Sequence, residues 1–213
     1  MQRIFRIEEN KRIAEDVYRL VLSGDTSDIT RPGQFVNISL KDFFLRRPIS
    51  VCDWENDRLT LIYKVVGNGT DALSKMTAGD SLDVLSGLGN GFDTANAGKA
   101  PLLFGGGVGT PPVYGLAKRL VLAGKPVEVV LGFASAKDAF YIDEFEALND
   151  MYDFGCEGFE GDRPEVRVHV ATVDGSLGTK GFVTDCLRYI PECSGPWPVP
   201  GRKSAWPCRG RMS

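Results

Sequence analysis

The chain has 213 residues, of which 43% are hydrophobic, enough to form the core of one large domain or of two small ones. The formal net charge of −3 gives no basic field of the kind that nucleic-acid binding requires. No run of 18 apolar residues is present to cross a membrane, and the first residues, MQRIFRIEENKRI, lack the apolar core of a signal peptide. We therefore expect a protein that binds neither nucleic acid nor membranes.

The cysteines are odd in number and widely spaced, which makes a poor disulfide framework. They are Cys52, Cys156, Cys186, Cys193 and Cys208. Free thiols persist in a reducing compartment, so a cytoplasmic protein is expected. The acidic residues of segment 138–146 fit a solvated helix start better than a metal site, and no metal ligands are assigned.

Residues 1–97 have the pattern of short strands separated by turns. Residues 17–22 and 34–40 alternate apolar and polar side chains, and residues 59–66 form a stronger apolar run rich in β-branched and aromatic residues. Turn signals lie at residues 31–33, 56–57 and 78–80. Several short strands at this spacing predict an antiparallel β-barrel.

From residue 98 the pattern changes to strands and helices in strict alternation. Apolar strands are predicted at residues 101–104, 127–132 and 166–171, and helices at residues 110–123, 141–151 and 179–189. This alternation is typical of parallel βαβ units and predicts an α/β domain with a doubly wound parallel sheet over residues 98–190. Residues 153–164, rich in glycine and acidic residues, are expected to form an exposed loop.

The last segment, residues 191–213, fits neither pattern. It holds five of the twelve prolines and two of the three tryptophans, and its four basic residues outnumber one acidic residue. No apolar periodicity is present, so an irregular tail is expected. Two interpretations stay open, a basic tail and an out-of-frame terminus. The second is favoured, since a shifted frame of a GC-rich gene generates codons for Pro, Arg, Gly, Trp and Cys.

A glycine-rich segment, GGGVGTPP at residues 105–112, lies between a predicted strand and a predicted helix. Glycines allow a pyrophosphate to approach the backbone closely, and the helix N-terminus offers free N–H groups and the positive end of a dipole. The segment departs from the pattern GxGxxG. A tight turn without a ligand is therefore the alternative interpretation.

Two segments of the predicted barrel carry groups that suit a flavin nucleotide. In RPIS at residues 47–50, the arginine is able to bind phosphate bidentately and the serine to hydrogen-bond a flavin ring nitrogen. Residues 62–70, IYKVVGNGT, end a strand with two glycines and a threonine. Taken singly, the first segment is typical of an exposed basic surface and the second of a plain turn.

In this order, the three segments resemble the ferredoxin-reductase superfamily. Within it, LRRPISV, IYKVVGNGTDAL, GGGVGTPPVYGLAK and GTKGFVTD are similar to the electron-transfer subunits of class B dihydroorotate dehydrogenases, and the resemblance runs from about residue 3 to residue 190. It implies a two-domain ferredoxin-reductase-like fold. An FAD-binding antiparallel β-barrel would occupy residues 1–97 and an NAD-binding α/β domain residues 98–190.

The resemblance also implies cofactor contacts. The positions that correspond to the family's FAD contacts are Arg47, Pro48, Ile49, Ser50, Ile62, Tyr63, Lys64, Gly69 and Thr70, with Ser50 as the candidate catalytic residue. Those expected near NAD(H) are Gly105, Gly106, Gly107, Val108, Gly109, Thr110 and Asp174. In the family a hydride passes from nicotinamide C4 to flavin N5, and the protein supplies orientation rather than an acid or a base.

The implied function is oxidation of NADH, or reduction of NAD, with electron exchange to an FMN-containing dihydroorotate dehydrogenase catalytic subunit. The family forms a heterotetramer in pyrimidine biosynthesis. A general NAD(P)H:ferredoxin or sulfur-reducing flavoprotein is the alternative within the superfamily. NADH is preferred over NADPH on the likeness alone.

One part of the family pattern is missing. Family members continue into a lobe that binds a [2Fe–2S] cluster through four cysteines, in a pattern like C-x4-C-x2-C with a distant fourth. Here fourteen residues separate Cys193 from Cys208, and no close pair exists. We expect the iron–sulfur lobe to be missing or out of frame from about residue 191. A truncated chain that binds FAD without completing electron relay is a further alternative.

Overall fold

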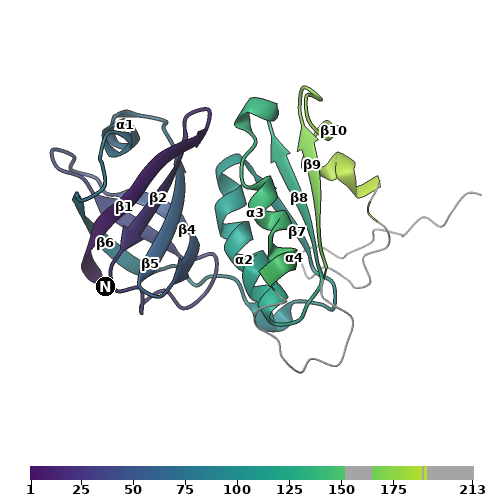
Figure 1. The fold of residues 1–213 in the computed structure, drawn as a ribbon, viewed down its shortest axis with the longest axis horizontal. Coiled ribbons are helices and arrows are strands. Elements are labelled where there is room, and N and C mark those ends of the chain that lie inside the picture. The colour runs from purple at the N-terminus through teal and green to yellow at the C-terminus, as the bar shows by residue number, and fades with distance from the viewer. Residues whose placement is uncertain (152–164, 189, 191–213) are drawn as a thin grey trace, which may run out of the picture.

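The computed structural model describes residues 1–151, 165–188 and 190. These residues form a closed barrel and a parallel sheet with its helices, packed side by side (Figure 1). The predictions for residues 153–164 and 191–213, and for Cys156, Cys193 and Cys208, lie outside the described residues.

Six antiparallel strands close the barrel in the order β1-β2-β5-β4-β3-β6. Their bounds are β1 Gln2–Ala14, β2 Val17–Ser23, β3 Phe35–Ser39, β4 Arg47–Glu55, β5 Arg58–Lys64 and β6 Ser81–Leu88. The strands predicted at residues 17–22, 34–40 and 59–66 are confirmed as β2, β3 and β5. Strands β1, β4 and β6 are not among the predicted elements; in β1 many side chains are polar and exposed, whereas β6 alternates buried and half-buried residues over most of its length.

The connections on either side of β5 differ from each other. Asn56 and Asp57, predicted as a turn, join β4 to β5 with φ angles of 48° and 60°, as a type I′ hairpin turn requires. After β5 the chain does not form the plain turn of the alternative interpretation. It forms helix α1 (Asn68–Ser74), in which Thr70 accepts hydrogen bonds from the backbone N–H groups of Val66 at 2.9 Å and Gly67 at 3.3 Å.

Strand β4 carries a bulge that joins the two halves of the molecule. Val51 pairs with Leu61 and Asp53 with Thr60, so Cys52 is an extra residue in the strand. Val51 belongs to the barrel core, whereas Cys52 packs in the apolar cluster of the sheet and its helices. The bulge thus turns one barrel residue toward the second half of the chain.

The barrel core depends on large, fully buried side chains such as Phe5, which is 0% exposed. Replacing Phe5 with alanine is expected to cost about 3–5 kcal/mol of unfolding free energy, because it leaves a cavity in a closed barrel. Its neighbour Ile4 is 66% exposed, so Ile4→Ala is expected to change stability by less than about 0.5 kcal/mol. Denaturant unfolding of both variants checks the contrast, and equal midpoints would contradict it.

The second half is a parallel sheet of order β10-β9-β8-β7. Its elements are β7 Leu102–Gly106, α2 Thr110–Leu122, β8 Val127–Phe133, α3 Ile142–Glu146, α4 Leu148–Met151, β9 Val166–Thr172 and β10 Thr179–Lys180. Short 3-10 helices span Thr94–Asn96, Gly107–Gly109, Ala136–Asp138 and Val183–Arg188. The strands predicted at 101–104, 127–132 and 166–171 and the helix at 110–123 are confirmed.

Two predicted helices need correction. The helix predicted at 179–189 is wrong, because Gly181 has a φ of 128° that no α-helix accommodates, and the segment divides into β10 and the 3-10 helix Val183–Arg188. The helix predicted at 141–151 begins one residue later and divides into α3 and α4. Tyr141 itself is left-handed, with a φ of 66°.

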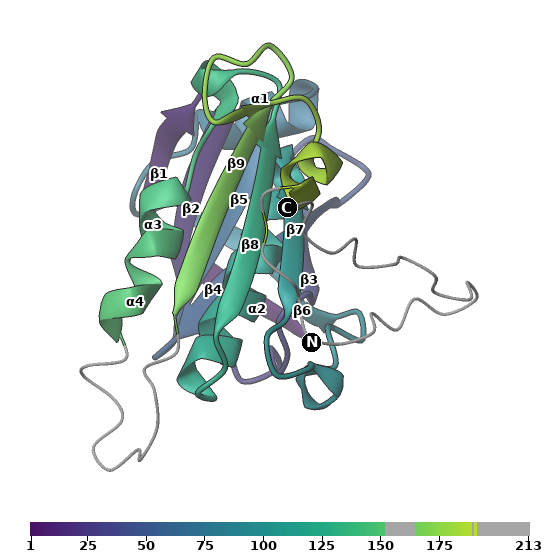
Figure 2. The same ribbon diagram turned by 90° about the vertical axis from the view of Figure 1, so that its right-hand side faces the viewer.

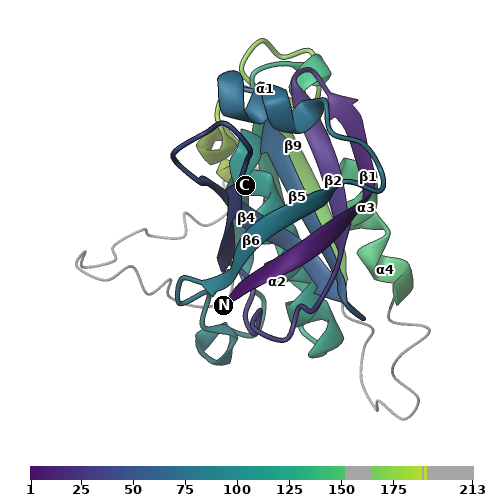
Figure 3. The same ribbon diagram turned by 90° about the vertical axis from the view of Figure 1, so that its left-hand side faces the viewer.

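Helices α2, α3 and α4 lie between the sheet and the barrel, and the 3-10 helix Val183–Arg188 packs on the other face of the sheet (Figures 1 and 2). Seen from the barrel side, β1, β2 and β5 lie in front of the sheet (Figure 3). No helix in the described part of the chain is both long and apolar enough to cross a membrane.

Candidate functional site

The glycine-rich segment forms the turn that leads from β7 into α2. Gly105 and Gly106 are the last residues of β7, so the strand extends two residues beyond its predicted end. Gly107 has a φ of 49°, and a Cβ built at Gly107 or Gly109 would meet no atom within 4 Å. The backbone of this turn therefore borders open space, the shape that close approach of a dinucleotide requires.

Thr110 begins α2 directly after this turn. Its side chain is fully buried, and its Oγ1 has no hydrogen-bond partner among the described residues. Gly105 lies against it, because a Cβ at Gly105 would be 3.1 Å from the Thr110 Cα. Val108 is half exposed. An unpartnered hydroxyl at the N-terminus of a 13-residue helix fits a site for an anionic group.

Arg47 is the first residue of β4, in the barrel. Its guanidinium lies 4.9 Å from the centre of the Phe43 ring and donates a hydrogen bond to the Leu45 carbonyl. It also fills the space beside Gly69, where a Cβ would come within 2.0 Å of Arg47 Nε. Arg47 and Gly69 are both predicted FAD contacts, and the structure places them next to each other. A larger residue does not fit at position 69, because the Arg47 guanidinium occupies that space.

The next residues of β4 alternate in exposure. Pro48 is exposed, Ile49 is buried in the barrel core, and Ser50 is half buried. The Ser50 hydroxyl makes no hydrogen bond to any residue that the structure describes. Across the sheet from Pro48, the Oδ1 atom of Asn37 is buried and likewise unpartnered within that part of the chain. Two polar atoms, one in the RPIS segment and one on the strand paired with it, thus have no hydrogen-bond partner in the described part of the chain.

The predicted contacts at the end of β5 are held by the protein itself. Ile62 is buried, and Tyr63 donates a hydrogen bond from its hydroxyl to Asn10 Oδ1 at 3.0 Å. Burial raises the pKa of Tyr63. Lys64 lies 3.9 Å from Asp138, in the α/β half. Side chains that are already engaged leave mainly the backbone of this strand for a cofactor.

Strand β5 and the glycine-rich turn lie together, because the turn Gly107–Gly109 contacts β5. Asp174 lies farther away, after β9 and two strands from β7, at the same carboxyl edge of the sheet. Its carboxylate accepts hydrogen bonds from the Ser176 hydroxyl at 2.6 Å and backbone N–H at 2.9 Å, which lower the pKa of Asp174. The carboxyl edge of a parallel sheet is where nucleotide ligands bind.

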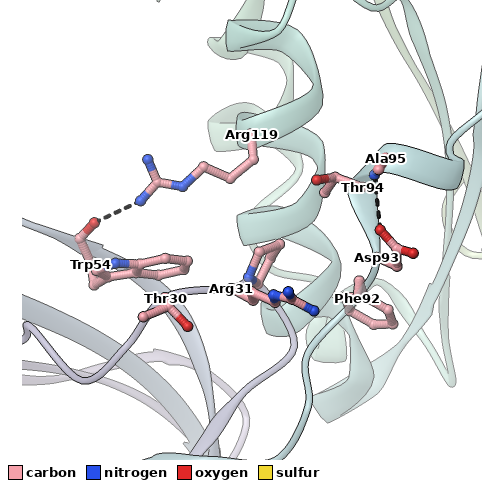
Figure 4. A pocket seen from close by; sticks show the side chains of 9 residues that line it. Thr30, Arg31, Trp54, Phe92, Asp93, Thr94, Ala95 and Arg119 are labelled. Carbon is pink, nitrogen blue, oxygen red and sulfur yellow. Dashed lines mark hydrogen bonds between the residues drawn. The ribbon is translucent and has the colours of Figure 1, made fainter.

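A pocket of about 500 Å³ lies at the opposite ends of β4 and α2 (Figure 4). Arg31, Trp54, Phe92 and Arg119 are among the residues that line it. None of the predicted site residues does so. Because Arg47 begins β4 and Thr110 begins α2, while Trp54 and Arg119 lie toward the far ends, this pocket is separate from the groups described above.

Relatives cover most of this chain. The electron transfer subunit of dihydroorotate dehydrogenase B (NAD(+)) from Listeria monocytogenes serovar 1/2a is 43% identical over 198 residues, 90% of this chain and 71% of that protein. The corresponding subunit from Bacillus pumilus is 41% identical over 190 residues, 85% and 67% of the two chains. The chain belongs to this family of electron-transfer subunits. A scan against protein-family profiles gives no match.

Solved structures agree on the architecture. The structure of an NADH-dependent reduced ferredoxin-NADP oxidoreductase matches with a TM-score of 0.69 at 33% identity. The match covers 87% of this chain and 62% of the oxidoreductase chain. A ferredoxin NADP+ reductase from Neisseria gonorrhoeae with bound FAD and NADP has a TM-score of 0.70 at 17% identity, covering 88% of this chain and 76% of its own. The ferredoxin-reductase-like fold is confirmed.

The electron-transfer subunits are expected to bind an iron–sulfur cluster, and the described residues do not fit one. Cys52 and Cys186, the two described cysteines, are buried and free, and they belong to different apolar clusters. Across residues 1–151 and 165–188, no three His, Cys, Asp or Glu residues are grouped to hold a metal. Cluster ligation requires converging thiolates. No electron-transfer step is therefore assigned to a cluster.

Burial raises the pKa of the Cys52 thiol, with the nearby Asp53 carboxylate adding to the shift. A raised pKa keeps the thiol protonated where an ordinary thiol begins to ionise, and only the thiolate is nucleophilic. We expect Cys52 in the folded protein to resist iodoacetamide at pH 8, while the denatured chain is labelled. Peptide mass spectrometry measures both states. Rapid labelling of native Cys52 would contradict the prediction.

Proposed function

We propose that this chain is an FAD-dependent electron-transfer subunit that oxidises NADH, or reduces NAD, and exchanges electrons with a dihydroorotate dehydrogenase catalytic subunit. The observation that carries the proposal is the contact between the turn Gly107–Gly109 and strand β5. It joins the segment expected to bind a dinucleotide to the strand expected to bind a flavin. Family membership at 43% identity supports the same assignment.

In this proposal the barrel, predicted as residues 1–97, holds FAD, and the α/β part, predicted as residues 98–190, holds NAD(H). When bound, FAD supplies the hydride-accepting chemistry. Arg47 binds the flavin nucleotide's phosphate, and Ser50 donates its free hydroxyl to a flavin ring nitrogen. The open backbone at Gly107 and Gly109 accepts the pyridine dinucleotide.

The remaining predicted residues orient the cofactors through their backbone or position. Lys64 bridges to Asp138 and so connects the flavin-binding strand to the α/β half. The buried side chains of Ile62 and Tyr63 fix the end of β5, which leaves the strand's backbone atoms in place for the ring system. No residue is required to transfer a proton in hydride transfer itself.

The partner in this proposal is an FMN-containing catalytic subunit, in a heterotetramer with two copies of each chain. The names of the relatives support a dihydroorotate dehydrogenase partner. A cytoplasmic location is also proposed, because five scattered cysteines suit a reducing compartment.

The first test is reconstitution. The purified chain is incubated with FAD, desalted, and titrated anaerobically with NADH while the flavin absorbance is followed. We expect retained FAD and bleaching by NADH. Addition of the catalytic subunit and dihydroorotate to the oxidised protein with NAD is then expected to produce NADH. A chain that retains no flavin would refute the proposal.

A second candidate is a general NAD(P)H:ferredoxin reductase. It is favoured by the 33% identity to an NADH-dependent reduced ferredoxin-NADP oxidoreductase. The two functions separate in one assay: reduced flavoprotein is mixed with ferredoxin or with the dihydroorotate dehydrogenase catalytic subunit, and its reoxidation is timed. Faster reoxidation by ferredoxin would favour the second candidate.

A further inference from the structure

Helix α2 is fixed to the bulged end of β4 by contacts with successive residues of the strand. A Cβ built at Gly115 would lie 2.5 Å from the carbonyl oxygen of Cys52, so helix and strand backbones meet directly there. One turn later, Lys118 reaches the barrel as an ion pair. Its Nζ lies 2.5 Å from Asp53 Oδ2 and 3.2 Å from Glu55 Oε2.

The next helix residue completes the contact. Arg119 donates a hydrogen bond to the Trp54 carbonyl at 3.1 Å, and its guanidinium carbon lies 4.3 Å from the centre of the Trp54 ring (Figure 4). Each residue of β4 from 52 to 55 is therefore held by α2. We call this set of contacts the α2–β4 clamp.

Lys118 is the buried charged residue of the clamp. Its side chain is 7% exposed and that of Asp53 19%, whereas Glu55 is 64% exposed. A lysine is seldom buried unless its charge is paired, and replacing a buried pair by apolar residues is often neutral for stability. Stability alone is therefore a weak explanation for a lysine at this position. Orientation of α2 relative to β4 is the role that we consider instead.

The clamp lies in the second half of β4 and around the middle of α2, whereas the predicted cofactor contacts lie at the first residues of both elements. Strand β4 begins at Arg47, and α2 begins at Thr110 after the glycine-rich turn. At 1.5 Å per residue, about 12 Å of helix separates Thr110 from Lys118. A tilt of about 5° around the clamp would then move the turn by about 1 Å, a displacement that in enzymes costs up to about 100-fold in rate.

We propose that Lys118 is a positioning residue that, by pairing with Asp53, holds the dinucleotide-binding turn at the distance from the flavin-binding strand that hydride transfer needs. The inference rests on the proposed function, because it concerns the distance between the two cofactors. Replacement of Lys118 is therefore expected to change the rate of flavin reduction. It is not expected to change FAD affinity, because Arg47 and α1 keep their own contacts.

The test compares Lys118→Met with Arg58→Met, both reconstituted with FAD. Arg58 also pairs with a carboxylate, Glu8 at 2.9 Å, but on the exposed surface of the barrel alone. Stopped-flow bleaching at saturating NADH gives the hydride-transfer rate constant, and flavin fluorescence gives the FAD dissociation constant. Lys118→Met is expected to slow bleaching about tenfold or more, with FAD affinity within twofold of wild type. Arg58→Met is expected to leave both unchanged.

A second variant controls for unfolding caused by the Asp53 charge, which Lys118→Met leaves unpaired. Asp53→Asn combined with Lys118→Met removes both charges, so its folding no longer depends on the pair. It is expected to fold and to stay slow. Bleaching within twofold of wild type in the double variant would overturn the inference while leaving the proposed function intact. A wild-type protein that NADH does not bleach would overturn the proposed function and this inference together.

Discussion

Replacing Arg47 with alanine is expected to weaken FAD binding about 100-fold. A guanidinium hydrogen-bonded to an anionic phosphate contributes about 3 kcal/mol, and about 1.4 kcal/mol corresponds to a tenfold change in dissociation constant. Arg47 is placed for this contact, because its guanidinium lies beside Gly69 at the start of α1 and is held there by the Phe43 ring. Fluorescence titration of the apoprotein with FAD measures the loss.

The adjacent Arg46 gives a matched control. Its guanidinium pairs with both carboxylate oxygens of Asp83, at 3.2 and 2.9 Å, and donates to the Asn37 carbonyl, so it joins barrel strands to one another. Arg46→Ala is expected to lower the unfolding temperature while FAD affinity stays within about threefold of wild type. Equal losses of affinity in the two variants would indicate a general effect of barrel stability and would contradict the role given to Arg47.

The elements that were predicted correctly from sequence are those whose conformation is determined by their own residues. The Asn56-Asp57 turn is one example, since both residues tolerate positive φ. The apolar run of β5 and the helix with Pro111 and Pro112 in its first turn are others. The mistaken helix at 179–189 contains Gly181, which has a φ of 128° and leaves no room for a Cβ beside Asp185, features that periodicity does not reveal.

The sequence predicts the three segments of the candidate site, but it does not predict how they lie relative to one another in the fold. Nothing in the local pattern of residues 105–112 says which barrel strand the turn will contact, because that depends on how α2 docks. The docking depends on the bulge at Cys52, which requires the register of β4 against β5. Only Lys118 gives a sequence signal: it stands at i+4 from Tyr114 and i−3 from Val121, on the side of α2 that a soluble helix would keep apolar.

Replacing Gly109 with valine is expected to lower kcat/KM for NADH about 100-fold while FAD binding is retained. Gly109 has φ of −82° and ψ of −13°, which valine adopts without a positive-φ penalty, and its Cβ would meet no protein atom within 4 Å. The added isopropyl group therefore costs the fold little. It fills the space over the turn through which a dinucleotide must approach the backbone, and a displacement of about 1 Å is sufficient for a loss of this size.

The matched control for this change is Gly98→Val, because a Cβ at Gly98 also meets no atom within 4 Å and its φ lies outside the positive range. Steady-state dye reduction gives kcat and KM for NADH, and dithionite bleaching shows that the bound flavin is still reducible. If Gly109→Val kept normal NADH kinetics, the open space at the turn would not be the dinucleotide site. Since the variant adds bulk without strain, such a result would count against the site itself rather than against the folding of the variant.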